Sequence, residues 1–258
     1  YNAIDPIFNG SGGWPAVDNS TWFGAAEVIL DPTTNSICGG DVALIRLSTS
    51  IPSVCPLVPR VDSILTVGET YTAKGFGITG PAYDSQGNPI STYQSTAGTR
   101  RTVSGMTVAC LNQSGCQTAD GISGTLEWVG AASTAKGTCE GDSGGPSLDS
   151  IGRVTGAVSR GPGDACNQTV YGSVYGHAAW IKAKAAYAAA MGGYNAADWV
   201  DGGSTTVNPC GSSSDGGTTG GCPSGQTCQD ATGAGDFLCL LPTGDAPSGL
   251  VDCLSSGT

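Results

Sequence analysis

Residues 138–146, with the sequence TCEGDSGGP, contain the residue types that nucleophilic attack on a carbonyl requires. A nucleophilic Ser needs a sharp turn that exposes its Oγ and aims backbone N–H groups at the developing oxyanion. Glycines on both sides of Ser143 permit such a turn. We therefore predict that Ser143 is a nucleophile, with the N–H groups of Gly141 and Ser143 as its oxyanion hole. The alternative is a Gly-rich hairpin with an ordinary Ser, but the full string is far more specific than Gly-Asp-Ser-Gly alone.

The elements that must hold this turn are predicted to be short β-strands. Charged residues make up 12% of the chain, about half of the ~25% usual in soluble domains, and there are 42 glycines. This composition argues against helical bundles and coiled coils, which need Glu, Lys and Leu in quantity. Apolar runs interrupted by Gly, Pro and Asn are typical of an all-β sandwich or barrel. They fall at residues 25–30, 42–47, 70–73, 102–109, 126–131, 154–158 and 170–174.

The C-terminal part of the chain has a different character. Residues 178–191 are Ala-rich, lack Gly and Pro, and are followed by two glycines, which predicts a helix with its C-cap. From residue 194 onward Gly, Ser, Thr and Asp dominate, and no Lys or Arg follows Lys184. We predict a flexible linker at residues 193–209 and a small Cys-stapled module at residues 210–258.

The 11 cysteines indicate the compartment. Zinc sites need closely paired Cys or Cys/His ligands, and the sequence has no such pairs, so disulfides in an oxidising, extracellular setting are favoured. Because the number is odd, at least one Cys is free or pairs with another chain. Tyr1 has no basic signal-peptide region around it, so we expect a processed, secreted chain.

Charge and hydropathy exclude several classes of partner. The net charge of −11 argues against binding to nucleic-acid phosphates. No apolar stretch approaches the ~20 residues of a membrane span. We expect a protein or peptide substrate and no cofactor. The predicted chemistry needs no metal, although the acidic loops could bind structural Ca²⁺.

Several further segments, in order along the chain, resemble the trypsin/chymotrypsin-like (S1) serine endopeptidases. Residues 38–47, CGGDVALIRL, resemble the strand whose Asp orients the catalytic His, and residues 75–77, GFG, resemble a Gly-Trp-Gly motif. Residues 159–161, SRG, resemble the Ser-Trp-Gly strand that holds the substrate backbone. Residues 170–174, together with Trp180 and Ile181, resemble the last strand and terminal helix. The resemblance covers residues 25–185.

This resemblance implies an all-β fold of two antiparallel six-stranded barrels with the active site between them and a helix at the end. Residues 1–65 would be the remainder of the first barrel, without its early strands, and residues 66–192 the second barrel with the helix. It also implies a disulfide from Cys139 to Cys166 that braces the specificity pocket. We also assign Cys110 and Cys116 to disulfides.

In the mechanism of this family, Ser143 would attack the scissile carbonyl, a His would act as general base and Asp41 would fix its tautomer. The only histidine, His177, follows Ser143 at a strand–helix junction, so we predict a structural or helix-capping role for it. The catalytic His should precede Asp41 by roughly 45 residues, and no His lies there. The N-terminal amine that pairs with the Asp beside the nucleophile, here Asp142, is also missing.

Two hypotheses follow from the missing His. In the first, cleavage of a precursor leaves an upstream polypeptide that carries the His and the early strands, stays bound by sheet pairing, and is required for activity. In the second, the chain is a catalytically silent protease-fold binding module. The complete Ser143 turn and the presence of Asp41 favour the first hypothesis.

The resemblance also suggests the substrate-binding residues, which are Gly137, Thr138, Glu140, Ser159, Arg160, Gly161 and Thr169. Gly137 would lie at the base of the S1 pocket, with Gly161 and the β-branched Thr169 in its wall. A short pocket without a basal Asp predicts small to medium apolar P1 residues. Arg160, at a position where the family has Trp, is expected to favour acidic subsites.

The tail carries weaker information. Residues 222–228, CPSGQTC, resemble Cys-rich modules appended to secreted bacterial proteins. Surface binding, export and resistance to proteolysis all remain open as its role.

Overall fold

The structure is a computed structural model that describes most of the chain between residues 23 and 202. The described residues are 23–33, 36–49, 51, 56–81, 84–88, 90–94, 96–111, 116, 122–131, 137–162 and 166–202, with the backbone of three strands between residues 227 and 254. The predicted all-β fold is confirmed, since strands predominate and helices are few.

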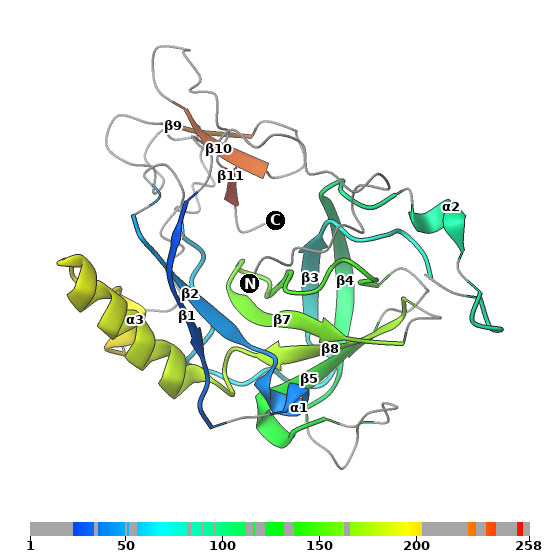
Figure 1. The fold of residues 1–258 in the computed structure, drawn as a ribbon, viewed down its shortest axis with the longest axis horizontal. Coiled ribbons are helices and arrows are strands. Elements are labelled where there is room, and N and C mark those ends of the chain that lie inside the picture. Colours follow the sequence, from blue (N-terminus) through cyan, green and yellow to red (C-terminus); the bar gives the residue numbers. More distant parts are fainter. Residues whose placement is uncertain are drawn as a thin grey trace.

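Six antiparallel strands close into a barrel (Figure 1). They are β3 (Thr70–Gly75), β4 (Arg101–Cys110), β5 (Glu127–Ala131), β6 (Pro146–Leu148), β7 (Val154–Arg160) and β8 (Gln168–Ser173). Their order around the barrel is β3-β4-β5-β8-β7-β6, so each strand has two hydrogen-bonded neighbours and the barrel has no free edge. The short 3-10 helix η3 (Gly124–Leu126) leads into β5, and α2 (Ser91–Gln94) lies in the connection from β3 to β4.

Aromatic side chains fill the middle of this barrel. The rings of Trp128 and Tyr171 stack with centroids 4.2 Å apart, and Tyr71 meets Trp128 edge-on at 5.0 Å. All three side chains are buried, together with Met106 and Val108 from β4. The apolar runs of the sequence therefore become barrel strands because their alternate residues face this core.

The first part of the chain forms a two-stranded antiparallel ribbon, with β1 (Ala25–Leu30) paired to β2 (Ala43–Leu47). Val28 lies opposite Ile45 in the register, and together with Leu30 these side chains make one face of the ribbon. Val28, Leu30 and Ile45 are 60%, 67% and 61% exposed. An isolated ribbon with an apolar face in water is marginally stable at best. The short helix α1 (Ile37–Gly40) lies between the two strands in the sequence.

The predicted helix is α3 (Ala178–Gly192), which ends at Gly193 in the left-handed conformation, φ 67°. Beyond it, the 3-10 helix η4 (Asp198–Val200) packs against α3. This part of the predicted linker therefore folds back onto the helix. Figure 1 shows α3 at the left and the barrel at the right.

Three short strands lie within the predicted Cys-rich module. They are β9 (Thr227–Asp230), β10 (Asp236–Leu240) and β11 (Asp252–Leu254), and β10 is the middle strand of an antiparallel sheet. The cysteine pairing predicted for this module lies outside the described side chains.

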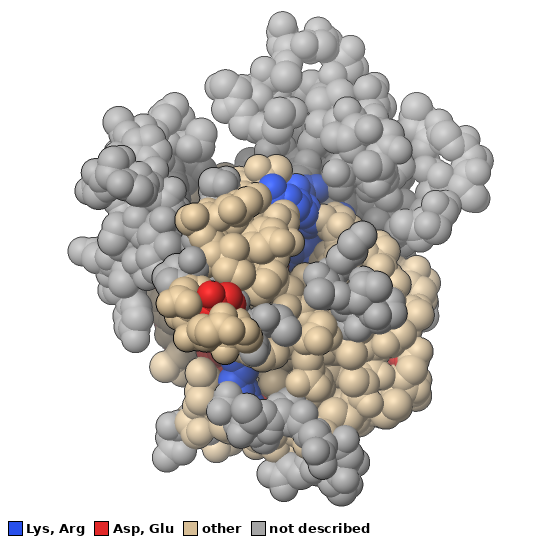
Figure 2. Space-filling view, turned by 90° about the vertical axis from the view of Figure 1, so that its right-hand side faces the viewer, with Lys and Arg blue, Asp and Glu red and all other residues tan. Residues whose placement is uncertain are grey.

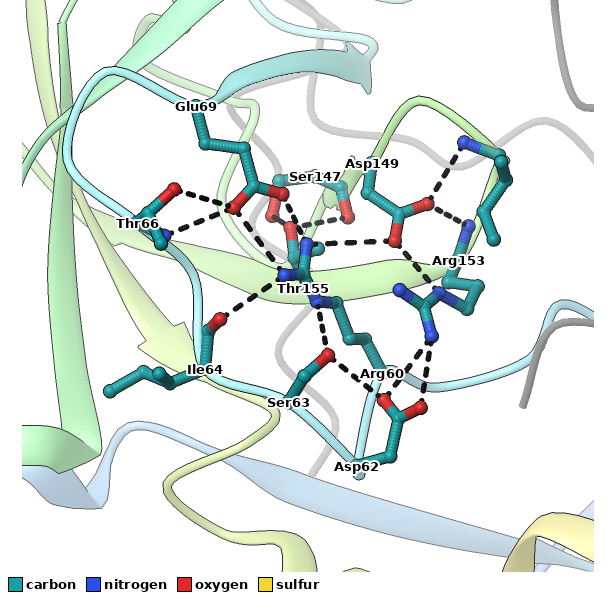
Figure 3. A network of polar contacts seen from close by, with 11 residues as sticks. Arg60, Asp62, Ser63, Ile64, Thr66, Glu69, Ser147, Asp149, Arg153 and Thr155 are labelled. Carbon is teal, nitrogen blue, oxygen red and sulfur yellow. Dashed lines mark hydrogen bonds and ion pairs between the residues drawn. The ribbon is translucent and has the colours of Figure 1, made fainter. Parts of the chain in front are cut away.

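The segment that connects the ribbon to the barrel is fastened by a network of charges (Figure 3). The guanidinium of Arg60 bonds Glu69 and lies 3.7 Å from Asp149. Asp149 accepts a hydrogen bond from Arg153 at 2.8 Å, and Arg153 also pairs with Asp62 at 3.2 Å. Since Asp149 is buried, these bonds replace the water that its charge has lost.

Charged groups occupy little of the surface on the face shown in Figure 2, where the side of the molecule at the right of Figure 1 is turned to the viewer. The described surface there is mostly uncharged, with small, separate areas of positive and negative charge. This agrees with a chain in which 12% of the residues are charged.

We expect the substitution Asp149→Asn to lower the free energy of unfolding by about 3 kcal/mol, because it breaks the buried ion pair with Arg153 and removes a negative charge from beside Arg60. Asp62→Asn is the matched control, since it removes the half-exposed partner of the same Arg153 and should cost about 1 kcal/mol or less. Urea unfolding at pH 7 measures both values. Equal losses in the two variants would show that Asp149 is not the centre of the network.

Candidate active site

The turn that carries Ser143 is held against β7 by its backbone. The N–H of Gly144 donates to the carbonyl of Val158 at 2.8 Å, and the N–H of Val158 donates to the carbonyl of Gly145 at 2.9 Å. Gly141 and Gly144 have φ values of 89° and 79°, which residues with a side chain rarely adopt. The result is a sharp turn with Ser143 exposed at its tip.

The carboxylate of Asp142 holds this turn in place through two hydrogen bonds. It accepts hydrogen bonds from the N–H of Gly77 at 2.7 Å and from the N–H of Cys139 at 2.8 Å. A Cβ on Gly75 would lie 2.0 Å from an oxygen of Asp142, and a Cβ on Gly77 would lie 2.6 Å from the carbonyl oxygen of Glu140. The Gly-Phe-Gly segment therefore needs its glycines to let the Ser143 turn approach closely.

The proposed oxyanion donors are not used within the fold. Neither the N–H of Gly141 nor that of Ser143 donates to another group in the described ranges of the chain. Two such donors on a fixed turn can stabilise a negatively charged oxygen next to the Ser143 hydroxyl.

A cavity of about 220 Å³ opens beside Ser143. Six of the predicted substrate-binding residues line it, namely Thr138, Glu140, Ser159, Arg160, Gly161 and Thr169. Its volume lies below the ~300–1,000 Å³ usual for small-molecule sites, so it is sized for one side chain. The remaining predicted residue, Gly137, is not in the cavity wall: its N–H donates to the Cys166 carbonyl at 2.5 Å.

Two buried hydroxyl groups meet in the wall of this cavity. The Oγ1 atoms of Thr138 and Thr169 are 2.5 Å apart, and their residues are 7% and 2% exposed. Cys139 next to Thr138 forms a disulfide with Cys166, with the two Cα atoms 5.1 Å apart. These contacts link the Ser143 turn to β8 and the segment before it. A second disulfide joins Cys110 to Cys116.

Asp41 lies at the edge of the same site. The hydroxyl of Ser159, which lines the cavity, donates to Oδ2 of Asp41 at 2.8 Å. Asp41 itself is exposed, so this contact leaves part of its carboxylate open to another donor. The structure therefore brings Asp41, from the ribbon part of the chain, to the strand that borders the Ser143 turn.

Arg160 differs from its sequence-based expectation. Its guanidinium points to the buried carboxylate of Glu127, with Nη2 3.2 Å from Oε2. These side chains are 12% and 1% exposed. Burial alone raises the pKa of Glu127, but hydrogen bonds from Arg160 and from the N–H groups of Gly39 and Ser123 outweigh it and lower the pKa below 4.5. Because Glu127 neutralises the guanidinium, Arg160 does not offer a bare positive charge to an acidic substrate.

His177 is not placed to act as the general base for Ser143 in this structure. Its side chain is 0% exposed, and Nδ1 lies 2.8 Å from Oδ2 of Asp31, which directly follows β1. It occupies the N-cap position of α3, but its side chain does not cap the helix, so the helix-capping role is wrong. The structural role is supported, because the Asp31 contact ties the ribbon to the start of α3.

The family model for trypsin matches residues 16–182, which is more than half of the chain. The chain belongs to the trypsin family. The match assigns a serine protease domain to the segment that contains Ser143, Asp41 and the cavity. A comparison with curated proteins gave no match.

The described part of the chain offers few candidate sites other than the Ser143 turn. It contains no cluster of three or more His, Cys, Asp or Glu placed to hold a metal ion. Its helices are too short or too polar to cross a membrane.

Sequence reasoning missed Glu127 and Asp31. Glu127 is an acidic residue at the start of an otherwise apolar run, which is a signal that it has a buried partner. No comparable signal marks Asp31, because it lies 146 residues from His177.

The Glu127 carboxylate makes the stability of the trypsin-family domain depend on pH. Because its folded-state pKa lies below 4.5, its bonds stabilise the fold fully above about pH 4.5 and are lost as the pH falls through that pKa. Glu127→Gln has no charge to lose. We expect this variant to be less stable than the wild type at pH 7, and the difference to shrink as the pH falls below 4.5 and Glu127 becomes protonated. Urea unfolding across this range checks it, and a constant difference would contradict the prediction.

Proposed function

We propose that the chain is the larger part of a secreted serine endopeptidase that cleaves peptide bonds through a Ser-His-Asp triad and an acyl-enzyme. Ser143 attacks the scissile carbonyl, the N–H groups of Gly141 and Ser143 stabilise the oxyanion, and Asp41 orients the imidazole. The observation that carries this proposal is the hydrogen bond from Ser159 to Asp41, because it fixes an exposed carboxylate beside the cavity that Ser143 borders. The chemistry needs no metal or cofactor.

The histidine comes from an upstream segment of the same precursor, separated by cleavage. The burial of His177 against Asp31 supports this, since the one imidazole of the chain is committed elsewhere. The exposed apolar face of the β1–β2 ribbon, formed by Val28, Leu30 and Ile45, also supports it. Additional strands of the first barrel would cover that face and complete the sheet. Without its histidine a triad of this type loses about 10⁶ in kcat, so the isolated chain is expected to be nearly inactive.

Secretion is supported by the disulfides Cys139–Cys166 and Cys110–Cys116, which persist in oxidising compartments. A specificity for small or medium apolar P1 residues is supported by the cavity volume and by the contact between Thr138 and Thr169, which fills space that a larger side chain would need.

A fluorophosphonate probe on the protein isolated from its native source tests the proposal. We expect the phosphonyl group on Ser143, identified by mass spectrometry, and a His-bearing peptide from upstream in the precursor in the same sample. Ser143→Ala removes the labelling, while Ser147→Ala, at a buried Ser on β6, retains it. A preparation that contains the upstream peptide but stays unlabelled would support the silent binding module instead.

The assignment of Thr169 to the wall of the S1 pocket predicts the effect of the substitution Thr169→Gly. Removal of this side chain lengthens the pocket, so kcat/KM for substrates with Phe at P1 should rise relative to Ala at P1 by about tenfold or more. Thr155→Gly is the matched control, since Thr155 is also a buried barrel Thr but bonds Ser147 instead of lining the cavity. An unchanged Phe/Ala ratio in Thr169→Gly would show that Thr169 does not limit the pocket.

A further inference from the structure

Arg160 and Glu127 make contacts both with Ser159 on β7 and with the segment that carries Asp41. The proposed chemistry does not yet use these contacts. We propose that Arg160, held by Glu127, is a positioning residue: it orients the Ser159 hydroxyl toward Asp41, and the pair fastens segment 36–41 onto the barrel. The inference rests on the proposed function, because it assigns Asp41 a part in catalysis.

The direction of the hydrogen bonds defines the first half of this role. Nη1 of Arg160 donates to Oγ of Ser159 at 3.3 Å, and a guanidinium can only donate. The Ser159 oxygen is thereby occupied as an acceptor, and its hydrogen points to Asp41 at 2.8 Å. A Ser without such a donor could rotate its hydrogen toward other acceptors. The guanidinium thus selects the hydroxyl orientation that binds Asp41.

Glu127 holds the guanidinium and the Asp41 segment at the same time. One carboxylate oxygen accepts from Nη1 of Arg160 and the other accepts the N–H of Ser123 at 2.7 Å. The same carboxylate accepts the N–H of Gly39, two residues before Asp41. A Cβ on Gly39 would lie 2.7 Å from the Ser123 side chain, so this segment is packed closely on the barrel.

The cost of burying the pair argues for a positional role. Both side chains are nearly inaccessible, and a buried ion pair often stabilises a fold no more than apolar residues of similar size. A pair that fixes a reactive group has a reason to be there that does not depend on net stability. A displacement of about 1 Å at a catalytic group can lower the rate by about 10²-fold.

The test uses the assembled protein with its His-bearing segment and compares Glu127→Gln and Arg160→Met. We expect kcat for a small-P1 peptide substrate to fall by about tenfold or more in each variant, with KM changed by less than about threefold. Glu69→Gln is the matched control, because Glu69 also forms an ion pair with an Arg, but its contacts are to Arg60 and Thr66, away from the Asp41 segment. It should lose stability without a change in kcat.

The pH profile separates positioning from simple loss of stability. The charged groups that meet at this point are Asp41, Arg160 from β7 and Glu127 from β5, and the sulfur of Cys38 lies 3.8 Å from Arg160. Arg160→Met removes the positive charge beside Glu127, so the acid limb of kcat/KM should move to higher pH. Glu127→Gln removes the negative charge beside Arg160, so the limb should move to lower pH. A purely structural defect would move neither.

Hydrogen exchange gives a readout that does not depend on activity. We expect the amides of residues 36–42 to exchange about tenfold faster in Glu127→Gln and Arg160→Met than in wild type, and unchanged in Glu69→Gln. If exchange is unchanged, the anchoring is wrong whether or not the protein is a protease. If exchange rises but kcat and the acid limb do not change in an active assembly, the positioning role is wrong. Absence of turnover by the wild-type assembly would overturn the proposed function, while the exchange result would still decide the anchoring.

Discussion

The hydrogen bond from Ser159 to Asp41 is the contact on which the functional interpretation depends. It joins a strand of the closed barrel to Asp41, two residues before β2, so two parts of the chain far apart in sequence meet at one cavity. The Ser143 turn is held by different means: its backbone pairs with β7, and Asp142 anchors it to the Gly-Phe-Gly segment. The barrel therefore supplies both Ser143, the proposed nucleophile, and the Ser159 hydroxyl that binds Asp41.

Ion pairs between arginines and carboxylates join the first part of the chain to the barrel, although only 12% of the residues are charged. Arg60 and Arg153 fasten the connecting segment around Asp149, and Arg160 fastens the Asp41 segment around Glu127. In both networks one nearly buried carboxylate gathers arginine and backbone N–H groups, which satisfies its charge without water. The two networks thus attach the first part of the chain to the barrel at separate places.

The sequence was most informative for elements whose formation depends on residues close together in the chain. Residues 25–30 were predicted as a strand and form β1, because apolar runs between turn residues indicate strands directly. The helix at residues 178–191 was identified from its composition and following glycines. β6 was missed, since three residues beginning with Pro146 are too short to show a pattern.

The site was only partly predictable, because several of its contacts join residues that are far apart in the sequence. The Ser143 turn is a local motif, and its glycines are visible in the sequence. Glu127 and Arg160 are 33 residues apart, and their pairing was not predicted because nothing local in the sequence marks the buried partner of Arg160. The hydrogen bond from Gly137 to the Cys166 carbonyl likewise joins parts of the chain that only the folded structure brings together.

A peptidyl chloromethyl ketone with Ala at P1 tests the central claim most directly, because its ketone traps the nucleophilic Ser and its methylene alkylates the imidazole that serves that Ser. Mass spectrometry of the inhibited native protein then identifies both residues. Our account predicts one inhibitor bridging Ser143 and a histidine that lies outside these 258 residues. Alkylation of His177, or inhibitor on Ser143 with no histidine modified, would contradict it.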